Sequence, residues 1–227
     1  MENQEERDLQ EDNREDIKEF GSQTDLKLKT NIQFISIIGE IEGHSISGAD
    51  KKSTKYEHII PLLIGGQLDP KIEGILIILN TVGGDVEAGL ALSEMINSLS
   101  KPTVSLVLGG GHSIGVPLAT STDYSFIVPT ATMTIHPIRT TGLVIGVPQT
   151  FRYFQKMQQR ITEFIIRTSD IKKEDFLQLM YTTDELANDV GTILVGDQAV
   201  EYGLIDEVGG LSSALDKLDQ MIENKMK

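Results

Sequence analysis

Apolar runs rich in β-branched residues alternate with stretches of helical spacing between residues 32 and 136. Continuous runs such as EGILIILN at 73–80 are typical of strands that are buried on both faces of a sheet. The alternation predicts βαβ units, and therefore an α/β domain in which helices cover a parallel sheet. The expected strands are 32–39, 73–80, 102–108, 124–129 and 132–136, and the expected helices are 51–63, 86–99 and 113–120.

A long helix is expected next, from Pro148 to about Thr168. It contains no glycine, and its large apolar residues recur every three or four positions, which predicts one apolar face: Phe151, Phe154, Met157, Ile161, Phe164 and Ile165. A helix of this length, late in an α/β domain, is expected either in the core or at an interface between subunits.

The N-terminal segment differs from the rest of the chain. Residues 1–24 carry nine acidic and three basic side chains and few large apolar ones. Such a segment cannot offset its ordering entropy by burial, so residues 1–30 are expected to form a disordered acidic tail. An arm that docks on a partner is the alternative. The chain of 227 residues is long enough for one domain, which we expect over 31–220.

Composition excludes several classes of function. The formal net charge of −14 disfavours binding to a phosphate backbone, so no nucleic-acid partner is expected. With no cysteine, neither a disulfide nor a thiolate site can form. No secretory leader and no membrane-spanning stretch is recognisable, which favours a cytoplasmic protein. We expect no cofactor and no metal; His44 and His58 are at most a weak metal-binding pattern.

One serine lies within an unusual density of glycine. Residues 109–115 read GGGHSIG and follow the expected strand at 102–108, so Gly111 to Gly115 match G-x-S-x-G. In this pattern a sharp strand-to-helix turn exposes a nucleophilic hydroxyl, and nearby N–H groups at the helix start can hold an oxyanion. The alternative is a structural turn in which Ser113 caps the helix.

The histidine that could activate Ser113 is best sought at a strand end. His136 follows the apolar strand TMTI and lies 23 residues after Ser113, whereas the side chain of His112 is expected to point elsewhere. His136 is the only histidine after Ser113, and Asp123 is the only acid between them. This interval is too short for the α/β-hydrolase order, in which the acid precedes a histidine far downstream, so the order must be serine, histidine, acid. A second corner, Gly83-Gly84, joins an expected strand to an expected helix capped by Asp85, and could face an anion or a peptide; an ordinary βα turn is the alternative.

Four separated blocks together resemble the ClpP family, the proteolytic subunits of the Clp protease: ILNTVGG at 78–84, VLGGGHSIG at 107–115, TIHP at 134–137 and AVEYGLID at 199–206. The resemblance implies an α/β fold of the ClpP/crotonase type, a spiral core of ββα-type units with a long protruding handle helix at 148–168. It also implies that Ser113 is the nucleophile and His136 the base. The family's aspartate falls on Gly191, so Asp189 is preferred as the acid, with Asp184 and Asp197 as alternatives.

The resemblance further implies a cytoplasmic serine endopeptidase that acts on peptides or unfolded proteins, including precursor or signal peptides in preprotein export. The oxyanion hole would be formed by the N–H groups of Gly84 and Ile114. Substrate would lie along Gly83 and the strand after the histidine, with Pro137, Ile138 and Arg139 among its contacts. A homo-oligomeric ring is expected, and any ATP-driven unfoldase would be a separate chain, because no G-x-x-x-x-G-K-[ST] motif is present.

Two other functions remain open from the sequence. A subunit on the same scaffold could have lost proteolysis and act in assembly or regulation. A crotonase-type acyl-CoA enzyme would use the same oxyanion hole with a glutamate as acid or base, and Glu87 follows the Gly83-Gly84 corner.

Overall fold

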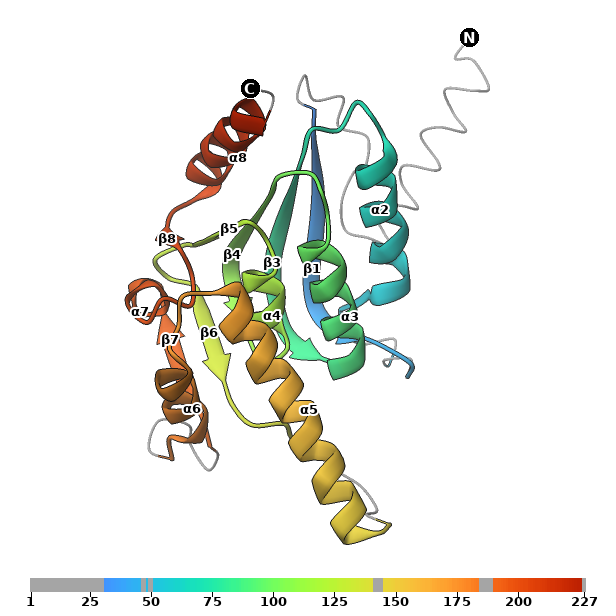
Figure 1. Cartoon of the computed structure of the whole chain (residues 1–227), viewed down its shortest axis with the longest axis vertical. Helices are drawn as coiled ribbons and strands as arrows, with labels where there is room; N and C mark the ends of the chain where they lie inside the picture. Colours follow the sequence, from blue (N-terminus) through green and yellow to red (C-terminus); the bar gives the residue numbers. More distant parts are fainter. Residues whose placement is uncertain (1–30, 46–47, 49–50, 141–144, 184–189, 226–227) are drawn as a thin grey trace. The chain divides into compact units, whose positions relative to one another are not determined.

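The computed structural model of the chain describes residues 31–45, 48, 51–140, 145–183 and 190–225 (Figure 1). The predicted acidic tail lies outside these residues. The central sheet has the strand order β2-β1-β3-β4-β5-β8, and its neighbouring strands are parallel. Its strands are β1 (Ile32–Glu42), β2 (Ser53–Lys55), β3 (Gly74–Gly84), β4 (Thr103–Gly111), β5 (Tyr124–Ile127) and β8 (Glu207–Val208). The predicted parallel α/β architecture is therefore confirmed.

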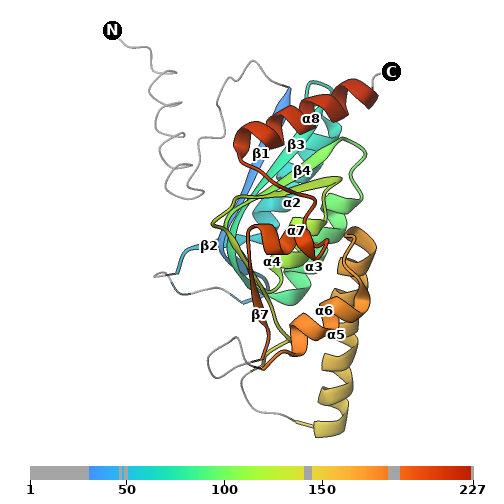
Figure 2. The ribbon, with the colours of Figure 1, turned by 90° about the vertical axis from the view of Figure 1, so that its left-hand side faces the viewer.

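Alternation along the strands gives the sheet two apolar faces. In β3, Ile75 and Ile77 belong to the larger core cluster, whereas Leu76 between them belongs to a smaller cluster on the opposite face. The larger cluster packs under α2 (Tyr56–Leu68), α3 (Val86–Asn97), α4 (Gly115–Thr120) and α5 (Val147–Thr168). The smaller one packs under α8 (Leu211–Lys225), on the other side of the sheet in Figure 2.

The segment 51–63 corrects one sequence prediction. A helix was expected over all of it, but residues Ser53–Lys55 form β2 and pair in parallel with the end of β1. The helix α2 begins only at Tyr56 and continues through two glycines to Leu68. The three polar residues of β2 have no apolar pattern that would predict a strand. They form one only because they pair with β1.

The C-terminal part contains elements that the periodicity did not predict. After α5 come α6 (Lys173–Tyr181), β7 (Thr192–Val195) and α7 (Asp197–Glu201). The strand β7 pairs antiparallel with β6 (Thr132–Ile135), which itself pairs with the end of β4. The paired strands form a small second sheet, in which β6 lies beside the Ser113 corner.

The predicted long helix is present as α5, from Val147 to Thr168. Figure 1 shows its first turns extending beyond the other elements of the domain, while its later turns lie against α4 and α6. No helix among the described residues is long and apolar enough to cross a lipid bilayer.

Candidate active site

Ser113 occupies a tight corner between β4 and α4. Its φ angle is 56°, in the left-handed region that side chains other than glycine rarely adopt. Two backbone hydrogen bonds fix the corner: His112 N–H donates to the Thr81 carbonyl at 3.1 Å, and Ser113 N–H donates to the Thr134 carbonyl at 2.9 Å. The corner is therefore held by β3 on one side and by β6 on the other.

The second glycine corner lies directly against the first. A Cβ added at Gly83, whose φ is 88°, would lie 2.7 Å from the Cβ of Ser113. A Cβ at Gly115 would likewise lie 2.7 Å from Cγ2 of Thr81 in β3. Only glycine at these positions allows the two strand ends to approach so closely. The family resemblance implies that both corners contribute to one oxyanion hole, and the structure brings the two corners into contact.

His136 follows the last residue of β6 and is half-buried. Its Nδ1 lies 2.7 Å from the carbonyl oxygen of Pro137. Because a carbonyl oxygen only accepts hydrogen bonds, the proton of the neutral ring is on Nδ1. In this tautomer Nε2 carries no proton, and it is the nitrogen that can accept one from a hydroxyl.

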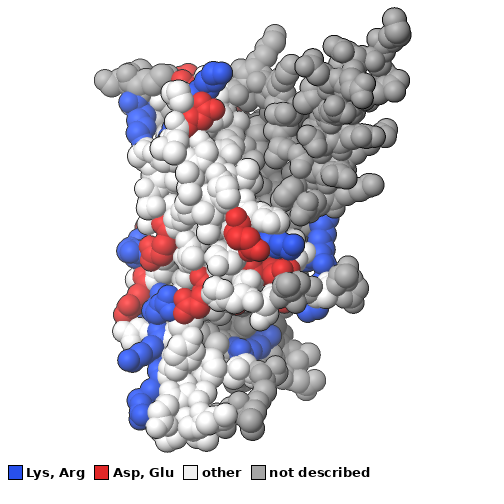
Figure 3. All heavy atoms as spheres, turned by 90° about the vertical axis from the view of Figure 1, so that its right-hand side faces the viewer, with Lys and Arg blue, Asp and Glu red and all other residues white. Residues whose placement is uncertain are grey.

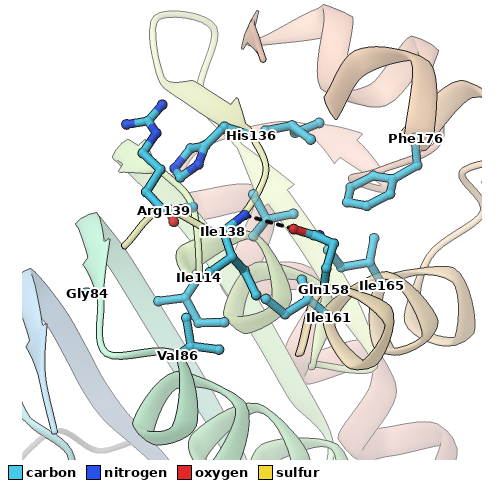
Figure 4. Close-up of a pocket in the computed structure, with 13 residues that line it drawn as sticks. Gly84, Val86, Ile114, His136, Ile138, Arg139, Gln158, Ile161, Ile165 and Phe176 are labelled. Carbon is cyan, nitrogen blue, oxygen red and sulfur yellow. Dashed lines mark hydrogen bonds between the residues drawn. The ribbon is translucent and has the colours of Figure 1, made fainter. Parts of the chain in front are cut away.

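One cavity of about 170 Å³ is lined by most of the predicted site residues: Gly84, Ser113, Ile114, His136, Ile138 and Arg139. Its remaining lining is mostly apolar and is contributed by Val86, Val116, Ile135, Ile161, Ile165 and Phe176. Figure 4 shows His136 and Arg139 on one side of this cavity and Gln158, Ile165 and Phe176 on the other. The helix α5 thus forms one wall of the cavity that contains the serine and the histidine.

The third member of the expected triad is not assigned by the described residues. Asp189 and the alternative Asp184 both lie outside them. The other alternative, Asp197, is exposed at the start of α7, where its Oδ1 accepts a hydrogen bond from the N–H of Gln198 at 3.1 Å. Asp197 does not line the cavity, which argues against it as the orienting carboxylate.

Sequence reasoning missed the contact between His112 and Thr134. The His112 ring is half-buried, and its Nδ1 lies 2.8 Å from Oγ1 of Thr134 in β6. Burial lowers the pKa of His112, and the charge of His136 lowers it further. His112 therefore belongs to the electrostatic surroundings of His136. No signal in the sequence could reveal this, since the partners lie 22 residues apart and meet only because β6 packs beside the end of β4.

The residues considered for a crotonase reaction or for metal binding do not line this cavity. Glu87 does not line the cavity; its carboxylate pairs with Arg160 of α5 at 2.8 and 3.0 Å. His44 packs edge-on against Tyr56, with ring centroids 5.9 Å apart. Among the described residues no three His, Asp or Glu side chains gather as metal ligands would.

Known proteins with similar sequences point to one family. A sequence profile of the Clp protease family matches residues 35–211. The chain is 58% identical over 197 residues to the translocation-enhancing protein TepA of Halalkalibacterium halodurans, in an alignment that covers 87% of this chain and 77% of that protein. It is 27% identical over 139 residues to the ATP-dependent Clp protease proteolytic subunit 1 of Protochlamydia amoebophila, covering 59% of this chain and 64% of that subunit.

A solved structure shows the same fold. A point mutant of ClpP1 from Listeria monocytogenes superposes with a TM-score of 0.64, covering 80% of this chain and 94% of that one, at 19% sequence identity. The fold likeness and the profile match both confirm the resemblance that the four sequence blocks suggested. The chain belongs to the Clp protease family.

Proposed function

We propose that this protein is a serine peptidase of the ClpP type, with Ser113 as nucleophile and His136 as general base. The observation that carries the proposal is that both residues line one cavity together with Gly84 and Ile114. Membership of the Clp protease family supports the same kind of reaction.

The reaction begins when the hydroxyl oxygen of Ser113 attacks a peptide carbonyl and Nε2 of His136 takes the hydroxyl proton. The N–H groups of Gly84 and Ile114 donate to the oxyanion, each contributing about 3 kcal/mol to transition-state stabilisation. The C–N bond then breaks, and His136 returns the proton to the leaving amine. Water hydrolyses the acyl-serine by the same steps in reverse. Asp189 is the proposed carboxylate that stabilises the imidazole when it is charged, while the Pro137 carbonyl accepts from Nδ1–H.

The substrate is an extended segment of peptide or unfolded protein. It lies beside Gly83 and the segment Pro137, Ile138 and Arg139, where main-chain pairing tolerates many sequences. The apolar wall formed by Val86, Ile161 and Ile165 favours an apolar side chain next to the cleaved bond. Precursor or signal peptides in preprotein export are the proposed natural substrates, supported only by similarity to a protein named for translocation.

We further propose that the protein is cytoplasmic and assembles as a homo-oligomeric ring in which α5 makes contacts between subunits. A separate ATPase unfoldase would deliver folded substrates. The family relationship supports the ring and the separate unfoldase. The exposed apolar residues near the start of α5 also support the contacts between subunits.

The test is labelling with a fluorophosphonate probe, followed by mass spectrometry of the labelled peptide. The wild-type protein is expected to be labelled at Ser113, and Ser113→Ala to lose that label. Peptide hydrolysis by His136→Ala is expected to fall by at least about 1,000-fold, since the triad members act as a unit. Equal labelling of wild type and Ser113→Ala would overturn the proposal and leave the assembly or regulatory role in its place.

A further inference from the structure

One peptide unit beside the candidate base is held at both of its ends. Its carbonyl, that of Pro137, lies 2.7 Å from Nδ1 of His136. Its N–H, that of Ile138, donates to Oε1 of Gln158 at 2.8 Å, the dashed contact in Figure 4. From this arrangement we propose that Gln158 is a positioning residue for His136, acting through the Pro137–Ile138 peptide unit. The proposal rests on the serine peptidase function above.

The geometry of a trans peptide explains how the effect is transmitted. The unit is planar, so its C=O and N–H point in opposite directions and rotate together. Fixing the N–H with Gln158 therefore fixes the direction of the carbonyl that faces His136. Hydrogen bonds in a chain also polarise one another, so an acceptor on the N–H makes the carbonyl a stronger acceptor for Nδ1–H. Gln158 thereby favours the tautomer in which Nε2 carries no proton.

The Gln158 side chain is itself held in place. It is half-buried on α5, and its Nε2 lies 2.9 Å from the sulfur of Met180 in α6. Because the Ile138 N–H requires an acceptor, the amide oxygen must face Ile138 and the amide nitrogen must face Met180. The contact thus joins α5 to the segment that directly follows His136. Sequence reasoning could not find it, since a lone glutamine in a long helix carries no signal of its partner 20 residues away.

The first measurement is the tautomer of His136, by solid-state ¹⁵N NMR of histidine-labelled full-length protein, assigned with His136→Asn. The neutral wild-type ring is expected to be protonated at Nδ1. Gln158→Leu, which removes the acceptor at similar volume, is expected to lower the fraction of this tautomer, and Gln158→Glu to preserve it because a carboxylate also accepts from Ile138 N–H. A wild-type ring protonated only at Nε2 would overturn the proposal without any variant.

The second measurement is the second-order rate constant of fluorophosphonate labelling. Gln158→Leu is expected to slow labelling about five- to tenfold, the scale of one hydrogen bond, while Gln158→Glu stays within about threefold of wild type. The matched control is Gln159→Leu, the next residue on α5, whose exposed side chain bonds only to Glu163 among the described residues. If Gln158→Leu matches Gln159→Leu in both measurements, Gln158 has no positioning role.

These outcomes separate the two proposals. Should Ser113→Ala label as well as wild type, the peptidase assignment fails, yet the tautomer measurement still decides whether Gln158 orients His136. Should Ser113 be the labelled residue while the Gln158 variants behave like the control, only the positioning role fails. Met180→Leu is expected to change both readouts less than Gln158→Leu, because it removes a contact that holds the amide but leaves the acceptor of the Ile138 N–H in the chain.

Discussion

Two glycines inside helices have opposite surroundings. A Cβ at Gly89 of α3 would collide with the Cγ1 and Cγ2 atoms of Ile114, the residue that follows the candidate nucleophile. A Cβ at Gly65 of α2 would meet nothing within 4 Å. The lack of a side chain at Gly89 therefore lets α3 pack against Ile114, the residue proposed to donate its N–H to the oxyanion. No neighbouring atom requires a glycine at position 65.

Alanine at these two positions is expected to have opposite effects. Gly65→Ala should raise the free energy of unfolding by about 0.5–1 kcal/mol, because alanine favours the helix. Gly89→Ala should lower it by about 1–3 kcal/mol, because overpacking exceeds that gain, and should also slow fluorophosphonate labelling. Urea unfolding followed by circular dichroism measures both, since the chain has no tryptophan. A Gly89→Ala protein as stable and as reactive as Gly65→Ala would contradict this account of the packing.

At the scale of elements, two ion pairs join α5 to α3 across a groove. Arg160 pairs with Glu87, and Arg167 contacts both oxygens of Glu94 at 2.8 Å. Figure 3 shows acidic and basic side chains interspersed on this side of the molecule. The hydrogen bond from Arg160 lowers the pKa of Glu87, and Arg160's own pKa is raised by the same contact. All four side chains are about half exposed, so each pair is expected to contribute little.

A double-mutant cycle with Glu87→Gln and Arg160→Gln is expected to give a coupling energy of about 0.2–1 kcal/mol at neutral pH and low salt. Since the pKa of Glu87 is lowered in the folded state, its contribution is present above the usual glutamate pKa and is lost as the pH falls through the folded-state value. The coupling should also shrink in 1 M salt. A coupling above about 2 kcal/mol, or one insensitive to salt, would show that the pair behaves as a buried one.

Periodicity predicted most elements with long apolar patterns, but no helix was predicted at α8, although Ala214, Leu218 and Ile222 recur there at helical spacing. The strands β3 and β4 and the helices α3 and α5 were placed within a few residues, and Asp85 caps α3 as expected, with Oδ1 accepting from Ala88 N–H at 2.8 Å. Short β2 and β7 were missed because tertiary pairing defines them. Within the site, the order of glycine corner, serine and histidine could be read from the sequence. The contacts around the histidine could not, because Gln158 meets Ile138 and His112 meets Thr134 only through packing.

At the scale of the whole molecule, an apolar surface is exposed where α5 begins. Within the described residues, the side chains of Ile145, Val147, Phe151 and Tyr153 are each more than half exposed, from 53% to 81%. A surface of this kind is typical of a contact between subunits. It lies on the part of α5 that extends beyond the other elements of the domain (Figure 1), so the expected ring would use it without covering the cavity wall formed by later turns.

Phe151→Glu is expected to shift the protein toward smaller assemblies, because a charge would have to be buried without a partner in any contact made by this surface. Native mass spectrometry measures the distribution, and circular dichroism checks that the fold is retained. Gln155→Glu adds the same charge at an exposed polar position one turn along α5 and should leave the distribution unchanged. A wild-type protein found only at 25.0 kDa would contradict the expectation of an oligomer.

The left-handed backbone at Ser113 has a consequence for how the proposed peptidase chemistry could be lost. Any residue with a Cβ is disfavoured at a φ of 56° by about 1 kcal/mol relative to glycine. A descendant released from selection for hydrolysis would therefore gain thermal resistance by mutating Ser113 to glycine. In related chains, a serine kept at this disfavoured position would indicate an active enzyme, and a glycine there would indicate an inactive one.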